Sequence, residues 1–229
     1  MSIQQRFEQL QQRVARAAQR AGRQPQSVCV LAASKTQSAA RINAAIAAGI
    51  RIIGENRVQE AASKFDQLSP VRKHLIGHLQ SNKAKAAVQL FDCIESLDRW
   101  ALAQRLDGQA RKLDKRLSVL IEVNAAAEAS KSGVAVSECL SLARKVSRCE
   151  HLLVQGLMII PPFTRDAEIN RPHFKTACTL YNELATLPGV QAAYLSMGTS
   201  QDFEVAIEEG ASLVRVGTVL FGPRNPSKE

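Results

Sequence analysis

A lysine near the start of the chain directly follows a short apolar run. Residues 28–33 are apolar, and Ser34 and Lys35 come next. An amine at the mouth of such a run is costly to keep charged, and partial desolvation lowers its pKa towards the neutral form that attacks a carbonyl. Lys35 is therefore a candidate for forming a Schiff base. The alternative is that its side chain only reaches from a strand end to solvent.

Two loops late in the chain have the composition of a phosphate site. They contribute small side chains, hydroxyls and backbone amides that a ligand can approach closely: Ser196, Gly198 and Ser200 in one loop, Gly217 and Thr218 in the other. The loops after the last two strands of an α/β barrel frequently bind phosphate. Ordinary turn chemistry remains the alternative, because Gly and Ser are common in loops.

An arginine lies inside the last apolar run. Val214 and Val216 flank Arg215, so the alternation of a strand turns Arg215 to the side opposite the valines. In a closed barrel the last strand lies beside the first, which brings Arg215 towards Lys35. An arginine that donates to a pyridine nitrogen is a known partner of pyridoxal 5'-phosphate (PLP) bound to a lysine. A structural ion pair with Glu55 or Glu122 is the alternative.

The elements that must position these residues alternate along the chain. The apolar spacing after Ser2 predicts an N-terminal helix over residues 2–22 within a segment, residues 1–24, that packs on the rest. The predicted strands cover residues 28–33, 50–53, 75–77, 93–96, 117–123, 153–160, 193–196 and 213–217. The clearest predicted helices cover residues 39–48, 58–68, 137–148, 174–187 and 203–209. About eight β/α units predict an α/β fold, a single (β/α)8 TIM-type barrel domain over residues 1–229, with an open doubly wound sheet as the alternative.

Composition narrows the class of protein. Hydrophobic residues make up 45% of the chain and aromatic residues 4%, which is typical of a parallel-sheet core of aliphatic residues. The net charge is +9, but the basic residues are scattered without interleaved aromatics, so we expect a solvated surface and no nucleic-acid partner. Five cysteines without a C-x-x-C pair indicate a reducing compartment, the cytoplasm, and no zinc site. The four histidines have no metal spacing, so no metal is predicted, and neither a signal peptide nor a membrane span is expected.

The motifs together resemble the pyridoxal phosphate homeostasis protein family, of the type labelled YggS or PROSC. The resemblance runs nearly end to end and rests on Ala33-Ser34-Lys35-Thr36, Gly54-Glu55-Asn56, Val58-Gln59-Glu60, His74-Leu75-Ile76-Gly77, Leu79-Gln80-Ser81-Asn82-Lys83, Ser130-Lys131-Ser132-Gly133, Gly156-Leu157-Met158, Leu195-Ser196-Met197-Gly198, Val214-Arg215-Val216-Gly217-Thr218 and Phe221-Gly222. It implies an alanine-racemase-like barrel with PLP as cofactor and Lys35 as the lysine of the internal aldimine. Further implied cofactor contacts are Asn56, Met158, Ser196, Gly198, Ser200, Arg215, Gly217 and Thr218. The chain departs from the pattern at Lys73, where a tryptophan often precedes the histidine, and at Thr199, where a second methionine often follows Gly198.

The expected role is to hold PLP rather than to turn substrate over rapidly. The related racemases add a separate β-domain that supplies a second base, and the barrel fills this chain. Tyr181 and Tyr194 lie outside the predicted site loops, and an arginine at the ring nitrogen weakens the electron sink. We therefore expect a PLP-buffering protein, monomeric, that hands the cofactor to PLP-dependent apoenzymes. A slow or narrow PLP-dependent racemase or lyase is one alternative, and a Schiff-base aldolase acting on a sugar phosphate is another.

Overall fold

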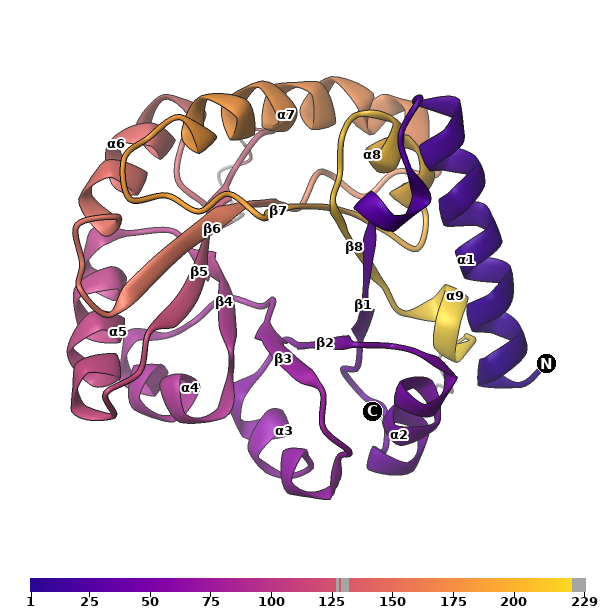
Figure 1. The fold of residues 1–229 in the computed structure, drawn as a ribbon, viewed down its shortest axis with the longest axis horizontal. Coiled ribbons are helices and arrows are strands. Elements are labelled where there is room, and N and C mark those ends of the chain that lie inside the picture. Colours follow the sequence, from indigo (N-terminus) through magenta and orange to yellow (C-terminus); the bar gives the residue numbers. More distant parts are fainter. Residues whose placement is uncertain (127, 129–131, 224–229) are drawn as a thin grey trace.

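Eight parallel strands close into a ring in the computed structural model, which describes residues 1–126, 128 and 132–223 (Figure 1). The strands follow one another around the barrel in chain order, and β8 pairs with β1 to close it. Their bounds are β1 Cys29–Ala33, β2 Ile52–Glu55, β3 Arg72–Leu75, β4 Cys93–Leu97, β5 Leu117–Val123, β6 Leu152–Ile159, β7 Tyr194–Thr199 and β8 Leu213–Val216. The (β/α)8 prediction is confirmed, and the open-sheet alternative is wrong.

Helices surround this ring on the outside (Figure 1). The α-helices are α1 Ile3–Arg20, α2 Ala39–Ala48, α3 Val58–Ala62, α4 Ala84–Leu90, α5 Trp100–Lys112, α6 Val136–Val146, α7 Arg171–Ala185, α8 Phe203–Glu208 and α9 Thr218–Phe221. Short 3-10 turns cover η1 Pro25–Ser27, η2 Phe65–Gln67, η3 Ser81–Lys83 and η4 Ala167–Asn170. No helix in the described part of the chain has the length and apolarity that a membrane crossing requires.

The N-terminal helix α1 lies outside the ring, next to α2, α8 and α9 (Figure 1). Ser2 caps it as predicted, in a capping box with Gln5. Phe7, Leu10 and Val14 are buried along one face, because their three- and four-residue spacing places them on one stripe. Ion pairs from α1 to α8, such as Arg13 with Glu204 at 3.1 Å, add to this apolar contact.

Several predicted boundaries move in the structure. Strand β2 includes Glu55 and β7 extends to Thr199, so these residues belong to strands rather than to the loops that follow them. Strand β3 begins at the polar Arg72 and ends at Leu75, where the prediction has a strand over 75–77. The helix predicted over 58–68 ends at Ala62 and resumes as a 3-10 turn.

Inside the ring the packing is divided into apolar and polar parts. One apolar cluster contains Leu31 of β1, Ile52 of β2, Leu213 of β8 and Ile76, which directly follows β3. Buried polar side chains complete the interior, among them His74, Glu95, Ser196 and Arg215. Because a buried polar group is costly unless it is hydrogen-bonded, the bonds among these residues decide where each side chain can point.

Candidate functional site

A pocket of about 240 Å³ opens at the carboxyl ends of the strands, the end at which barrels of this type carry their sites. Half of its lining residues come from β1, β8 and the segments directly after them, and the others from the ends of β2, β3, β6 and β7. The lining residues are Ala33, Lys35, Asn56, Ile76, Ile160, Thr199, Ser200, Arg215, Gly217 and Thr218. The structure therefore brings Lys35 and Arg215 to one cavity.

The guanidinium of Arg215 is held by a chain of buried hydrogen bonds. Its Nη1 donates to Ser196 Oγ at 2.6 Å, and its Nη2 donates to the carbonyl of Ile159 at 2.7 Å. Ser196 Oγ in turn donates to Glu95 Oε2 at 2.5 Å. Burial lowers the pKa of Arg215, while the nearby carboxylates, Glu95 first among them, act in the opposite direction. The Ser196 hydroxyl thus links Arg215 to the Glu95 carboxylate, and this link fixes the orientation of the guanidinium.

This polar chain continues towards the amino end of the barrel. Glu95 Oε1 lies 2.7 Å from His74 Nδ1, and the His74 ring meets the Tyr194 ring edge-on at 6.0 Å between centroids. The Tyr194 hydroxyl accepts a hydrogen bond from Arg72 at 3.0 Å. A column of polar groups therefore runs through the barrel interior and ends at Arg215, which lines the pocket.

Glu122 on β5 is a second buried carboxyl close to Arg215. Its side chain is buried, and its Oε2 has no hydrogen-bond partner within the described residues. Burial raises the pKa of Glu122 from 4.5 to about 7, assisted by the charge of Asp98 and opposed by Arg215 and Arg99. Burial therefore favours the protonated form of this carboxyl.

Hydroxyls and backbone amides gather where β7 and β8 end, at Thr199 to Ser200 and at Gly217 to Val219. Ser200 Oγ accepts hydrogen bonds from the amides of Gly217 at 3.0 Å and Val219 at 3.5 Å. Thr199 is held by Asp202, whose Oδ1 accepts from the Thr199 amide at 2.6 Å and from its hydroxyl at 2.9 Å. A Cβ at Gly217 would have only Ala33 atoms near it, at 3.8 Å, so the glycine leaves space within the cavity.

Six of the nine predicted site residues line this pocket, namely Lys35, Asn56, Ser200, Arg215, Gly217 and Thr218. Three do not. Ser196 is fully buried with its hydroxyl engaged by Arg215 and Glu95, and Met158 packs inside the barrel with Cys93 and Leu120. Gly198 has φ +88 and faces α8, where a Cβ would lie 2.5 Å from Ala206 Cβ. Direct cofactor contacts from these three stay predictions.

Other participants were absent from the sequence prediction. Thr199, which departs from the family pattern, lines the pocket together with Ile76 and Ile160. Glu95 and His74 also belong to the site, and the sequence prediction does not include them. The signal that could have found them is strand alternation, which turns polar residues on other strands to the barrel interior, where Arg215 also points. The alternative ion pair of Arg215 with Glu55 is wrong, because Glu55 is bonded to Ser34 at 2.6 Å and pairs with a lysine, Lys64, at 2.5 Å. The motif residues Ser130 and Lys131 lie outside the described residues.

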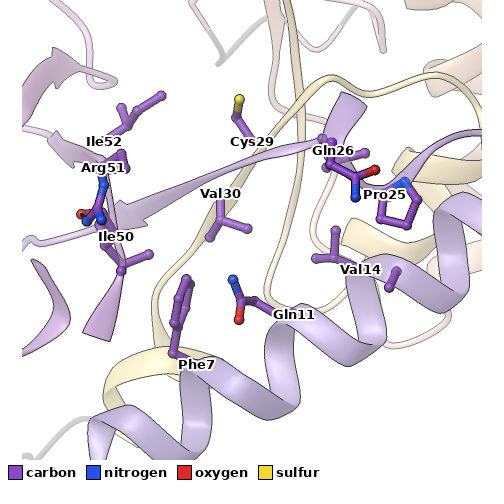
Figure 2. A pocket seen from close by; sticks show the side chains of 13 residues that line it. Phe7, Gln11, Val14, Pro25, Gln26, Cys29, Val30, Ile50, Arg51 and Ile52 are labelled. Atoms are coloured by element: carbon purple, nitrogen blue, oxygen red, sulfur yellow. Dashed lines mark hydrogen bonds between the residues drawn. The ribbon is translucent and has the colours of Figure 1, made fainter. Parts of the chain in front are cut away.

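A larger cavity of about 430 Å³ lies between α1 and the beginnings of β1 and β2 (Figure 2). Figure 2 shows Phe7 of the helix pointing towards Val30 and Ile50, while Cys29 points to the other side of β1. Its wall is mostly apolar and lies away from the carboxyl ends of the strands. None of the described residues that line this cavity is a lysine, so it offers no side-chain amine for a Schiff base. Its larger size therefore does not make it the candidate site.

Comparisons with known proteins show the family and the fold of the chain. Residues 6–225 match the model of the family described as alanine racemase, N-terminal domain. The chain is 40% identical to the pyridoxal phosphate homeostasis protein of Pasteurella multocida, over all of both chains, and 41% identical to that of Vibrio alginolyticus, over 99% of each. The structure of PipY from Synechococcus elongatus with PLP bound superimposes with a TM-score of 0.84, at 37% identity, over 96% of this chain and all of that one.

Proposed function

The chain belongs to the pyridoxal phosphate homeostasis protein family, and from that premise we propose that it binds PLP in the pocket between β1 and β8 and carries the cofactor for other proteins. PLP binding is the property stated for the solved relative, PipY. In this chain the observation that supports it best is the presence of Lys35 and Arg215 in the wall of one cavity.

The residues of the pocket fit the chemistry of this cofactor. PLP offers an aldehyde, a flat aromatic ring with one nitrogen, and a phosphate dianion. Its lining contains the amine of Lys35, the guanidinium of Arg215, the hydroxyl-bearing Ser200 and Thr218, and Gly217, whose amide donates to Ser200 Oγ at 3.0 Å. Apolar contacts from Ala33, Ile76 and Ile160 suit the ring faces. The cavity of about 240 Å³ is smaller than the roughly 300–1,000 Å³ typical of drug-sized ligands, as expected for one ring and one phosphate.

The roles proposed for individual residues follow from their chemistry. Lys35 would hold the cofactor through its side-chain amine, and bound PLP would supply an aldehyde that reacts with primary amines. Arg215, held by Ser196, donates to the ring nitrogen. Ser200, Gly217 and Thr218 bind the phosphate, and Asn56 lines the ring. We assign Ser196 to the support of Arg215 rather than to the phosphate.

Slow chemistry is the better-supported mode of action. Bound PLP supplies an electron sink for reactions at the α-carbon of amino acids, and a racemase needs a second acid or base beside the lysine. Among the described residues that line the pocket, the titratable side chains are Lys35 and Arg215. Arginine keeps its proton, so the ring nitrogen it faces gains little positive charge, and the electron sink is weak. These features favour a carrier over a fast racemase or lyase.

The test is the visible absorbance of the purified protein with PLP, before and after borohydride reduction. We expect a coloured adduct that borohydride fixes to Lys35, and no such adduct in Lys35→Ala. Transfer is tested by mixing the loaded protein with a PLP-dependent apoenzyme and following recovery of the apoenzyme's activity. Amino-acid turnover at ordinary enzymatic rates that requires Lys35 would contradict the carrier role and favour the racemase or lyase.

The remaining aspects are proposed on narrower grounds. All five cysteines are free thiols, which supports a reducing compartment, the cytoplasm. We propose a monomer acting as one barrel domain with α1 packed on it. Sedimentation of the PLP-loaded protein tests the oligomeric state.

A further inference from the structure

The turn that carries Lys35 has a strained backbone. It runs from Ser34 to Gln37, between β1 and α2, and the amide of Gln37 donates to the Ser34 carbonyl at 3.1 Å. Thr36, directly after Lys35, has φ +63, one of two positive values among the described non-glycine residues. The left-handed region is unfavourable for a β-branched residue by roughly 1–3 kcal/mol. Such a turn persists only where its surroundings hold it.

A second lysine, Lys64, spans both ends of this turn. It lies in the break between α3 and η2, and its side chain is buried. Its Nζ donates to the carbonyl of Ser34 at 2.9 Å and to the carbonyl of Gln37 at 3.4 Å. The residues before and after the Lys35–Thr36 pair are therefore tied to one ammonium group.

Two carboxylates complete the arrangement, and each also binds the turn. Glu55 Oε1 lies 2.5 Å from Lys64 Nζ and accepts from the Ser34 hydroxyl at 2.6 Å. Glu60 Oε1 lies 3.0 Å from the same Nζ and accepts from the Thr36 amide at 2.6 Å. Burial raises the pKa of Glu55, and its bonds to Lys64 and Ser34 act against that rise. Ser34, Thr36 and Gln37 thus each have a backbone or hydroxyl contact with Glu55, Glu60 or Lys64.

We propose that Glu55, Glu60 and Lys64, together the Lys64 clamp, are positioning residues that set the Lys35 turn so that the Lys35 amine is presented to an aldehyde. The proposal rests on the proposed function, because it names what makes Lys35 ready to form the Schiff base. The clamp holds the turn in its strained conformation before any ligand binds. The entropy cost of ordering the turn is then part of folding, and the turn does not have to be ordered during the reaction.

Two variants separate positioning from folding. Glu60→Gln weakens the hold on Thr36 at a side chain that is 29% exposed, and it should leave the fold intact. The double variant Glu55→Gln with Lys64→Met removes the buried charges together, because Lys64→Met alone would leave Glu55 buried and unpaired. Glu204→Gln is the matched control, since Glu204 is 35% exposed and its partner Arg13 lies on α1.

The first readout needs no PLP. Each protein is treated with a small aromatic aldehyde that lacks a phosphate, reduced with borohydride, and digested so that labelling at Lys35 is followed by mass spectrometry over time. We expect labelling to slow roughly tenfold in Glu60→Gln and up to about 100-fold in the double variant, as for a reacting group displaced by about 1 Å. Lys64→Arg in place of Lys64→Met should restore part of the rate.

The second readout is the rate at which PLP produces the visible adduct in the same proteins. Equal Lys35 labelling rates in wild type, Glu60→Gln and Glu204→Gln would overturn the positioning role, whether or not the double variant folds. Failure of the proposed function is distinguishable, because the wild type itself would then form no PLP adduct at Lys35 while the aldehyde labelling still compared the variants.

Discussion

Glu122 should give this protein a pH-dependent stability that a single substitution removes. Its pKa in the folded protein is raised from 4.5 to about 7, chiefly by burial. Between these two values the folded state binds more protons than the unfolded state, so the free energy of unfolding falls as pH rises. The rise corresponds to roughly 3 kcal/mol, because each unit of pKa is worth about 1.4 kcal/mol. This contribution is present below pH 4.5 and is lost as pH rises through about 7.

Glu122→Gln keeps the shape of the protonated carboxyl and cannot ionise. Urea unfolding of the cofactor-free wild type and variant, at several pH values between about 4.5 and 8, isolates the effect as a difference between two curves. We expect the two proteins to have similar stability near pH 4.5 and the variant to be more stable by up to about 3 kcal/mol near pH 8. Glu183→Gln, at an exposed position on α7, controls for glutamine itself. A difference that does not change with pH would refute the assignment of a raised pKa to Glu122.

Three further substitutions test the site and the barrel. Ser196→Ala breaks the link between Arg215 and Glu95, and hydrogen bonds to charged groups contribute about 2 kcal/mol. Equilibrium dialysis should therefore show PLP binding weakened roughly tenfold or more. Thr176→Ala is the control and should bind PLP normally, because the Thr176 hydroxyl donates to Pro172 in its own helix. Gly217→Val fills pocket space, so titration should show loss of PLP binding at nearly unchanged thermal stability, and normal binding would count against the proposed phosphate wall. Gly156 has φ +139, and Gly156→Ala places a Cβ 1.8 Å from the Tyr194 carbonyl oxygen. Urea unfolding should show that the free energy of unfolding falls by more than about 3 kcal/mol. Gly108→Ala in α5 is the control, and it should be neutral or slightly stabilising because no atom lies within 4 Å of its new Cβ.

The positions of Lys35 and Arg215 could be predicted because they depend on regularities of the chain. Counting alternating apolar runs places the first and last strands side by side, and the valines around Arg215 fix the side to which it points. The barrel itself could be predicted from the same alternation of strands and helices, because that pattern does not depend on tertiary contacts.

Residues that act through long-range hydrogen bonds could not be predicted in this way. The helix predicted over 58–68 would have placed Lys64 on a solvated face, and only the break after Ala62 turns its side chain towards the Lys35 turn. Strand β3 begins with Arg72 and Lys73, which look like a loop because their partners are distant in sequence. Arg72 donates to the Tyr194 hydroxyl on β7, and the Lys73 amide donates to Asp92. Ser196 looked like a phosphate ligand, and its commitment to Glu95 and Arg215 depends on three strands meeting inside the barrel.

A crystal structure of the protein grown with PLP tests the central claim most directly. The account predicts continuous density from Lys35 Nζ to the aldehyde carbon of the cofactor, with Arg215 within hydrogen-bonding distance of the ring nitrogen on the opposite side. Density for PLP on a different lysine, or in the cavity beneath α1, would contradict it.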